Sequence, residues 1–190
     1  MGRPRKFTEE AALSEILTVF QAKGYEAASI DDITKASGLS RASLYGVFGS
    51  KEQVFRETLK VYMAGVFAGL QLRIASESEP LVGLRAWFNV LPERCGKQGC
   101  LLAVALTERP NLSKEVGEDI DVYLSELSKT ILDALEKAQS RGKLSRFIGS
   151  ELDKEGAKLV GLYFAVANLV RGNHASLCKD IIESTLRTVD

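Results

Sequence analysis

The stretch of sequence that decides the fold runs from residue 29 to residue 48 and reads SIDDITKASGLSRASLYGVF. Ser29 and Ser40 can each cap a short helix, because a serine hydroxyl accepts a hydrogen bond from a backbone N–H of the first helical turn. Between the two helices, Gly38 supplies the left-handed backbone conformation that a tight turn needs, and Leu39 can fill the wedge between them. The stretch therefore predicts two short helices joined by a tight turn.

The second of these helices, expected from about residue 41 to residue 47, has two different faces. Leu44, Val47 and Phe48 are its plausible core residues. The outward face combines small and polar residues, namely Arg41, Ala42, Ser43, Tyr45 and Gly46. Small side chains keep this face slim enough to enter a major groove of DNA, and the guanidinium and hydroxyls can reach base edges or phosphates. The pattern thus indicates DNA binding, with simple helix packing as the alternative.

The stretch resembles the signature of the TetR family of bacterial transcription regulators, with several elements in the same register. These elements are Ser29-Ile30, Gly38-Leu39-Ser40, Ser43-Leu44-Tyr45 and Phe48-Gly49-Ser50-Lys51-Glu52. The upstream segment Phe20-Gln21-Ala22-Lys23-Gly24-Tyr25 is similar to the step that closes the first helix in that family. The resemblance covers about residues 7–57, and it implies an all-α homodimer whose N-terminal head binds DNA.

The resemblance also implies roles for individual residues of the head. Ser29 would bind a phosphate through its hydroxyl and backbone N–H at a helix N-terminus, and Tyr45 and Lys51 would hold backbone phosphates. The residues nearest the bases, after the helix start at Ser40, would be Arg41, Ala42, Ser43 and Gly46. Family members usually carry a large polar residue where Gly46 stands, so one phosphate contact is missing here or the backbone approaches the DNA more closely.

The N-terminal arm, Gly2-Arg3-Pro4-Arg5-Lys6, is basic although the chain as a whole has 25 basic and 25 acidic residues. Arg3 and Arg5 suit the narrow, electronegative minor groove that flanks an operator. A disordered, solubilising tail is the alternative. Because a local basic arm can hold phosphates while the rest of the chain is neutral, the net charge neither supports nor excludes DNA binding.

The rest of the chain has the apolar periodicity of helices, and no period-two alternation indicates a sheet. Helices are expected at about residues 9–24, 30–38, 41–47, 51–75, 80–93, 99–108, 113–142, 152–172 and 175–188, with breaks at Pro80, Pro92 and Pro110. We therefore predict an all-α, TetR-like fold with a helix-turn-helix head at 1–55 and an effector-binding and dimerisation body at 56–190. No apolar run reaches the roughly 20 residues of a membrane span, and no apolar stretch follows the basic N-terminus as in a signal peptide. We expect a cytoplasmic protein with no membrane partner.

The body is expected to bind a small-molecule effector and to pair two copies of the chain. Pairing would use the last two helices, at about 152–172 and 175–188, because the first of them is apolar around more than one face; an ordinary core helix is the alternative. A two-fold dimer would match a palindromic operator. Aromatic and aliphatic residues at helical spacing could line an effector pocket, although such residues are usually core. The candidates are Trp87, Phe88, Leu91, Leu101, Val104, Tyr123, Leu127 and Phe164, together with Cys100.

Cys95, Cys100 and Cys178 are an odd number of cysteines, which is not a disulfide framework. Cys100 follows Gly99 at the expected start of a helix, where the helix dipole lowers the pKa of a thiol. The Gly-Cys-Leu-Leu step is also similar to one in a TetR subgroup, some of whose members sense electrophiles or oxidants. A sensor thiol at Cys100 is one hypothesis and an inert core cysteine is the other. Ligand spacing supports neither a Cys95–Cys100 redox pair nor a metal site that adds Cys178 or His174, so no metal or cofactor is expected.

Two other classes of protein are the alternatives. A small helical enzyme would need a nucleophile–base pair, a carboxylate cluster or a phosphate loop, and the sequence has no P-loop, Glu-x-x-His or Gly-x-Ser-x-Gly motif. A protein-interaction adaptor could retain a helix-turn-helix, but it would not bind duplex DNA in a salt-dependent way. We therefore expect a one-component transcriptional regulator, a repressor by the usual mode of the family. It would bind palindromic operator DNA as a homodimer and be released by a small-molecule effector or by thiol modification.

Overall fold

The computed structural model describes residues 8–145, 147 and 150–187, and in these ranges the chain is helical with no strand. Its α-helices are α1 (Glu9–Ala27), α2 (Ile30–Ser37), α3 (Arg41–Phe48), α4 (Lys51–Ala75), α5 (Pro80–Cys95), α6 (Leu101–Glu108), α7 (Lys114–Ser140), α8 (Glu151–Arg171) and α9 (Ser176–Leu186), with short 3-10 turns η1 (Gly96–Gln98) and η2 (Arg109–Asn111). The predicted all-α fold class is confirmed. No helix in the described part of the chain is long and apolar enough to cross a membrane.

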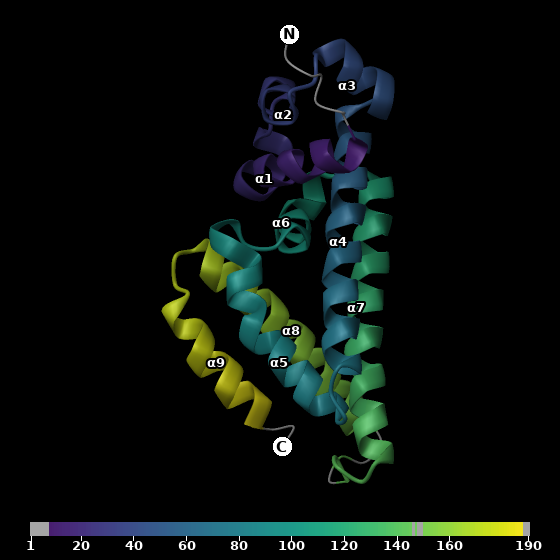
Figure 1. Ribbon diagram of the computed structural model, residues 1–190, viewed down its shortest axis with the longest axis vertical. Coiled ribbons are helices and arrows are strands. Elements are labelled where there is room, and N and C mark those ends of the chain that lie inside the picture. Colours follow the sequence, from purple (N-terminus) through teal and green to yellow (C-terminus); the bar gives the residue numbers. More distant parts are fainter. Residues whose placement is uncertain (1–7, 146, 148–149, 188–190) are drawn as a thin grey trace.

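Helices α1 to α3 and the start of α4 form the head, which lies at the upper end of the molecule in Figure 1. α1 packs against both α2 and α4, and the buried rings of Phe20 and Phe55 meet edge to face with their centroids 4.9 Å apart. Ile33 from α2 and Leu44 from α3 belong to the same core. Each short helix of the head therefore buries its apolar side and leaves its other side to solvent.

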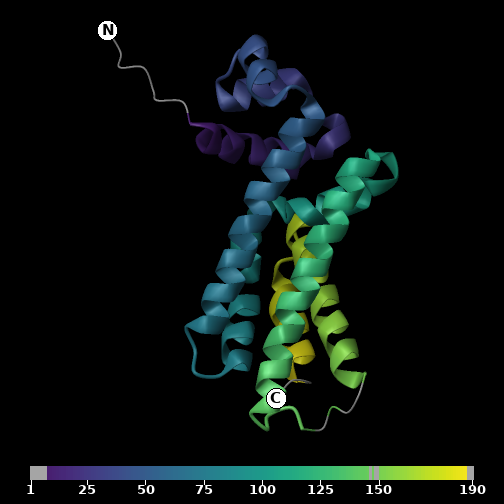
Figure 2. The ribbon, with the colours of Figure 1, turned by 90° about the vertical axis from the view of Figure 1, so that its right-hand side faces the viewer.

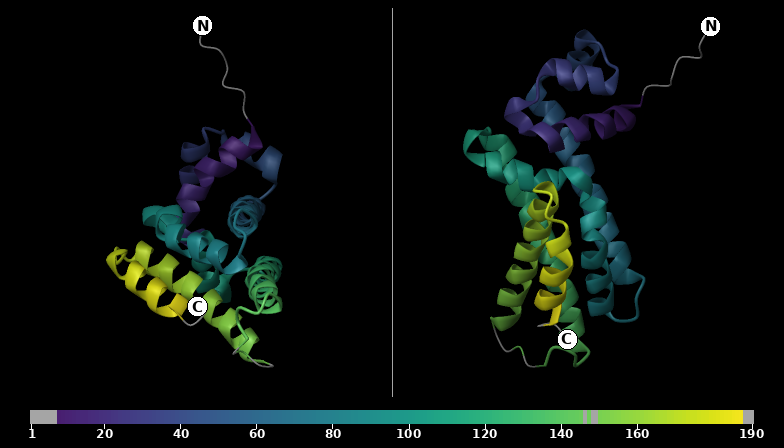
Figure 3. Two further views of the ribbon diagram at one scale, coloured as in Figure 1. Left: turned by 60° about the horizontal axis from the view of Figure 1, so that its bottom comes forward. Right: turned by 90° about the vertical axis from the view of Figure 1, so that its left-hand side faces the viewer.

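Helices α4 to α9 form the body, whose long helices run along the long dimension of the molecule (Figures 1 and 2). α4 continues from the head into the body, where it packs against α5 and α7. α8 contacts α5 and α7, and α9 lies against α8 on the outside of the body (Figure 3). The rings of Trp87 and Tyr163 stack with centroids 5.6 Å apart and join α5 to α8. Because α4 is continuous, it crosses the domain boundary expected at residue 55, and the division into 1–55 and 56–190 stays a prediction.

Pro92 does not break a helix, so this part of the predicted pattern is wrong. It lies inside α5, which continues to Cys95. A proline in a helix interior removes one backbone hydrogen bond. The adjacent Leu91 and the terminal Cys95 are both buried in the core, and their burial keeps the segment helical past the proline.

The head docks on the body where α1 meets α6. Gly24, predicted to end α1, interrupts it with a φ of 78°, after which the helix resumes. The carboxylate of Glu108 lies directly against Gly24, in the space that a side chain there would occupy, and it accepts a hydrogen bond of 2.6 Å from the backbone N–H of Tyr25. The side-chain amide of Gln21 donates to the carbonyl oxygen of Gly99 at 2.8 Å in a buried setting. Hydrogen bonds therefore join head and body in addition to the shared helix α4.

A reciprocal capping box holds the start of α2. The Oγ of Ser29 accepts a hydrogen bond from the backbone N–H of Asp32 at 3.1 Å, and the backbone N–H of Ser29 donates to the Asp32 carboxylate at 2.9 Å. The Nζ of Lys23 on α1 lies 2.6 Å from the same carboxylate. Hydrogen bonds from Lys23 and from Ser29 hold the pKa of Asp32 well below its usual range. The ionised form of Asp32 therefore stabilises the folded head.

We expect Gly24→Ala to lower the free energy of unfolding by about 1–3 kcal/mol, because alanine is strained at positive φ and its Cβ would displace the Glu108 carboxylate. Urea denaturation followed by circular dichroism measures the change. Gly46→Ala is the matched control: a Cβ at Gly46 meets open space, so this variant should be as stable as the parent or more stable by up to about 1 kcal/mol. Equal stability of parent and Gly24→Ala would contradict the expectation.

We expect Asp32→Asn to destabilise the protein at neutral pH and to lose that effect in acid. The folded-state pKa of Asp32 is depressed, so the stabilisation is present above the unfolded pKa of about 3.9 and is lost as the pH falls towards the folded-state value. Urea unfolding of parent and variant should differ most near pH 7, and the difference should shrink below about pH 4. Asp153→Asn, at an exposed carboxylate in the first turn of α8, is the control and should show no such dependence on pH. A parent–variant difference that is constant with pH would refute the assignment.

Candidate nucleic-acid interface

α3 presents a slim, polar face to solvent. Leu44 and Phe48, four residues apart, are buried on its inward side. The five residues predicted to face outward are all exposed in the structure: Arg41, Ala42, Ser43, Tyr45 and Gly46. Tyr45, which carries a large phenol ring, is 40% exposed. The surface expected to face DNA is therefore free of contacts that would bury it within the chain.

Val47, expected in the core of the head, is 42% exposed instead. The inward side of α3 is already filled by Leu44 and Phe48. Successive residues of a helix point about 100° apart, so Val47 cannot share the inward direction of its neighbour Phe48. It adds an apolar side chain to the exposed part of α3.

The turn between α2 and α3 has the geometry that its sequence predicts. Gly38 adopts the left-handed conformation, with φ 71° and ψ 10°, and its N–H donates to the carbonyl oxygen of Thr34. Leu39 is partly buried against the core. Ser40 then caps α3, since its Oγ accepts a hydrogen bond of 3.0 Å from the backbone N–H of Ser43. The Ser40 and Ser43 hydroxyls lie 2.8 Å apart, so both are present at the exposed start of α3.

The arginine of α3 is held by an ion pair within the head. The Nη2 of Arg41 lies 2.8 Å from the Oδ1 of Asp31, and both side chains are largely exposed. Ten residues separate the two in sequence, so the sequence alone did not predict that the turn brings them together. An exposed pair of this kind contributes about 0–1 kcal/mol, which a phosphate or a base edge can replace. The other predicted arginines, Arg3 and Arg5, lie outside the described residues.

Ser29 lies at the N-terminus of α2, as predicted, but its polar groups are engaged. Both its backbone N–H and its hydroxyl donate to the carboxylate of Asp32, at 2.9 Å and 2.7 Å. A phosphate at this helix N-terminus would therefore have to displace a carboxylate. The role of Ser29 as a phosphate ligand stays a prediction. The pairing of Ser29 with Asp32 could have been predicted from the sequence, because their three-residue spacing is that of a capping box.

Lys51, at the start of α4, extends towards the end of α1. Its Nζ lies 4.5 Å from the ring centroid of Tyr25 and 3.3 Å from the carbonyl oxygen of Glu26. Partial burial lowers the pKa of Lys51, while the nearby carboxylates of Glu108 and Glu26 act in the opposite direction. Lys51 is thus a cation in a defined position beside the head–body junction. Its predicted contact with a DNA phosphate stays a prediction.

A cavity of about 250 Å³ lies where head and body meet. Its walls come from α1, α4, α5 and α8, and they include Trp87 and Leu91 from the predicted effector pocket. The other predicted lining residues are packed elsewhere: Phe88, Cys100, Leu101, Val104 and Leu127 are buried, and Tyr123 and Phe164 are partly buried at the edge of the core. The wall that α1 contributes was not expected, because the predicted pocket lay in the body alone, and the α4 residues of the wall were not among its predicted lining residues.

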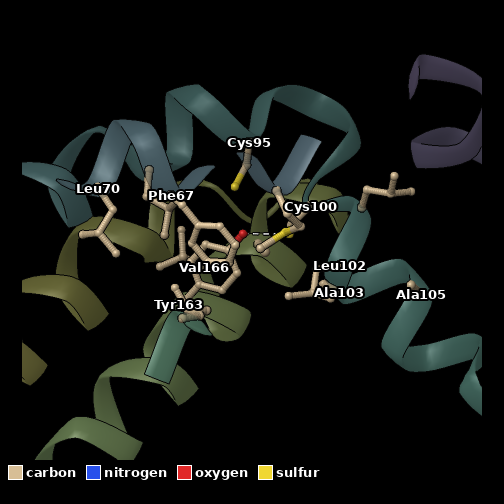
Figure 4. Packing of buried hydrophobic residues seen from close by; sticks show 14 of the residues in the cluster. Phe67, Leu70, Cys95, Cys100, Leu102, Ala103, Ala105, Tyr163 and Val166 are labelled. Atoms are coloured by element: carbon tan, nitrogen blue, oxygen red, sulfur yellow. Dashed lines mark hydrogen bonds between the residues drawn. The ribbon is translucent and has the colours of Figure 1, made fainter. Parts of the chain in front are cut away.

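Cys100 lies in the core just before α6, beside the hydroxyl of Tyr163 (Figure 4). The Sγ of Cys100 and the Oη of Tyr163 are 2.9 Å apart. Burial raises the pKa of the Cys100 thiol and outweighs the hydrogen bonds from Tyr163, Tyr62 and the first backbone N–H groups of α6, which lower it. The helix N-terminus lowers this pKa as expected, but desolvation of the thiolate is the larger effect, so the expectation of a net lowered pKa is wrong. Burial likewise raises the pKa of Cys95 to about 12.

The three cysteines, Cys95, Cys100 and Cys178, are free and buried. In the described part of the chain, no group of three or more histidine, cysteine, aspartate or glutamate side chains could hold a metal ion. The Cys95–Cys100 pair and the metal site with His174 thus gain no support from the geometry.

Sequence comparison agrees with the geometry of the head. Residues 12–58 match the family described as bacterial regulatory proteins, tetR family. The chain is 26% identical over 151 residues to the HTH-type transcriptional regulator YezE of Bacillus subtilis. The aligned region covers 76% of this chain and 77% of YezE. It is 40% identical over 62 residues to the HTH-type transcriptional repressor BdcR of Escherichia coli, which covers 33% of this chain and 32% of BdcR.

Solved structures share the fold along almost the whole chain. A cysteine variant of the TetR-family regulator CifR, complexed with a 26-base-pair operator DNA, has a TM-score of 0.85 at 24% identity and covers 98% of both chains. The reduced form of NemR from Escherichia coli has a TM-score of 0.81 at 18% identity, over 95% of this chain and 94% of NemR. Together with the match over the head, these findings lead to one assignment. The head at residues 12–58 is that of the TetR family of bacterial regulatory proteins, which are DNA-binding transcription regulators and not enzymes, and the chain shares the TetR-like fold.

Proposed function

We propose that the protein is a transcriptional repressor that binds operator DNA through the exposed face of α3. The observation that carries the proposal is the orientation of this helix, which buries its large apolar residues and leaves Arg41, Ser43 and Tyr45 exposed. Arg41, Ala42, Ser43 and Gly46 would lie nearest the base edges, and Tyr45 would donate to a backbone phosphate. The names of relatives support repression, since BdcR and ComR of Escherichia coli are both transcriptional repressors.

The proposal includes a homodimer that pairs through α8 and α9. Leu177 on α9 is 51% exposed, and Phe164 and Ile181 are only partly buried. Apolar side chains that stay accessible on one side of a soluble domain are typical of an interface. A two-fold dimer would carry two copies of α3 about 34–36 Å apart, the spacing of successive major grooves in a palindrome.

The proposed effector site is the cavity at the head–body junction, because its walls come from both parts. A bound molecule would shift the head only if it has different affinities for two head positions. The hydrogen bonds from Gln21 to Gly99 and from Tyr25 to Glu108 link α1 to the residues at the two ends of α6, so movement of α6 would be passed to the head. Modification of Cys100 is the less supported mode of release, since this thiol is buried and its pKa is raised.

Substitutions on α3 should separate phosphate contacts from base contacts. Tyr45→Phe is expected to weaken binding to every duplex by about 10-fold, because it removes one hydrogen bond to a charged phosphate. Arg41→Ala is expected to relax the preference at one base position, by about 1–3 kcal/mol. Fluorescence anisotropy at fixed salt, with an operator selected from a random pool and with a scrambled duplex, measures both effects.

Leu72→Ala, at an exposed residue near the far end of α4, is the control for these variants and should bind as the parent does. Unchanged binding by Tyr45→Phe or by Arg41→Ala would remove the role assigned to that residue. A parent protein that does not bind duplex DNA, or that binds it equally well at low and high salt, would favour the protein-interaction adaptor instead.

The homodimer is tested by placing a charge on α9. Leu177→Lys is expected to convert the parent dimer into a monomer, because burying an unpaired ammonium in an interface is costly. Size-exclusion chromatography with light scattering gives the mass of each species. Leu72→Lys is the matched control, since Leu72 is 70% exposed and lies outside the proposed interface. A monomeric parent, or a Leu177→Lys variant that stays dimeric at the same concentration, would refute this interface.

A further inference from the structure

The cavity at the head–body junction has an apolar wall and a single cation. Leu13 and Leu17 of α1 and Leu91 of α5 contribute apolar side chains. Arg94, near the end of α5, is the one charged side chain among the described residues that line the cavity. No carboxylate in the described part of the chain pairs with it, whereas Arg41, Arg56 and Arg109 all have such partners. The cavity therefore offers an uncompensated positive charge beside apolar surface.

The position of Arg94 is set by a glycine on α4. A Cβ at Gly69 would lie 2.7 Å from the Nη2 of Arg94, so the guanidinium occupies space that a side chain at Gly69 would fill. One turn earlier, Gly65 lines the cavity, and a Cβ there would meet open space. The two glycines thus have different effects: Gly69 lets the guanidinium pack against α4, and Gly65 leaves the cavity open.

A second donor in the cavity wall has no partner. Trp87 lines the cavity and is almost completely buried, and its Nε1 has no hydrogen-bond partner among the described residues. Buried indole N–H groups usually find an acceptor; this donor lacks one in the part of the chain that the structure describes and is itself covered, so a small shift of the ring would be needed for it to meet an oxygen atom in the cavity. Trp87 and Arg94 are seven residues apart on α5, which places them two helical turns, or about 10 Å, apart along the axis.

We propose that this cavity binds a small organic carboxylate with an apolar ring or chain and a second oxygen at its far end. The carboxylate would pair with Arg94, the second oxygen would accept from the Nε1 of Trp87, and the carbon skeleton would lie against Leu13 and Leu91. A cavity of about 150 Å³ is enough for benzene, so 250 Å³ accommodates one six-membered ring with two short substituents. Guanidinium and carboxylate groups form paired, charge-assisted hydrogen bonds, which favours a carboxylate over a neutral amide of the same shape.

The effect of this ligand on DNA binding rests on the proposed effector role, but binding of a carboxylate to the cavity can be measured without DNA. Trp87 is the sole tryptophan of the chain, so its fluorescence reports occupancy of the cavity directly. The probes are 4-oxocyclohexanecarboxylate, the matching 4-oxocyclohexanecarboxamide, and cyclohexanecarboxylate, which lacks the second oxygen. We expect the parent to bind the oxo acid at least about 10-fold more tightly than the amide, and more tightly than the unsubstituted acid.

Three variants keep the result interpretable. Arg94→Gln should abolish the preference for the acid over the amide, whereas Arg73→Gln, at an exposed arginine of α4 that does not line the cavity, should keep it. Gly65→Leu should weaken binding of all three probes by filling the cavity, and it should fold, because its Cβ meets open space. Thermal unfolding of each variant checks folding.

The proposal is overturned if the parent binds none of the probes or prefers the amide, if Arg94→Gln still prefers the acid, or if Gly65→Leu binds like the parent. Equal binding of cyclohexanecarboxylate and its oxo derivative would overturn the role of Trp87. The effector role is tested separately by adding the oxo acid to the protein–operator complex. If the oxo acid binds but does not release DNA, the effector role is contradicted and the carboxylate site stands. If the protein binds DNA but takes up no probe, the carboxylate site is contradicted and the DNA-binding function stands.

Discussion

The position of the head depends on the contact between one carboxylate and the end of α1. Glu108 lies against Gly24, where the positive φ and the missing side chain make room for it, and it accepts the hydrogen bond from the backbone of Tyr25. Lys51 lies over the ring of Tyr25, so the same cluster holds the start of α4. Hydrogen bonds to charged groups are directional and stronger than neutral ones, whereas apolar packing alone allows small rotations. Together with the continuous helix α4 and the Gln21–Gly99 hydrogen bond, this charged contact helps to set the direction in which α3 faces, although it lies some distance away from α3.

The charges of the head explain how a chain with no net charge can offer cations to a nucleic acid. Arg41 pairs with Asp31, and Lys23 pairs with Asp32, so each of these cations already has a carboxylate partner. DNA phosphates would replace such partners instead of meeting an excess of positive charge. Exchange of this kind costs little where the pair is exposed, as at Arg41. It costs more at Ser29, because Asp32 also caps α2. The head therefore combines one readily exchanged ion pair with one that supports its fold.

Local sequence signals were sufficient wherever the outcome depends on neighbours in the chain. Thr8, Ser29, Ser40 and Ser50 each accept a hydrogen bond from the first turn of the helix that follows, and Gly38 has the left-handed conformation that the turn requires. The same signals failed where burial decides. Pro92 is a helix breaker by local rules, yet it lies within a helix that the core holds in place. The thiol of Cys100 is at a helix N-terminus, as expected, but desolvation reverses the direction of its pKa shift.

The all-α fold, the helix-turn-helix and the outward side of α3 were determined by the sequence alone. They follow from periodicity, caps and glycines within a few residues of one another, and such short-range preferences act in the same way in any surroundings. The cavity and its isolated cation were decided only by the tertiary structure. Leu13, Gly69 and Arg94 come from α1, α4 and α5 and carry no shared local signal, and Gln21 and Gly99 meet across 78 positions of the chain. Contacts over such separations depend on how the helices pack, so no pattern along the sequence specifies them.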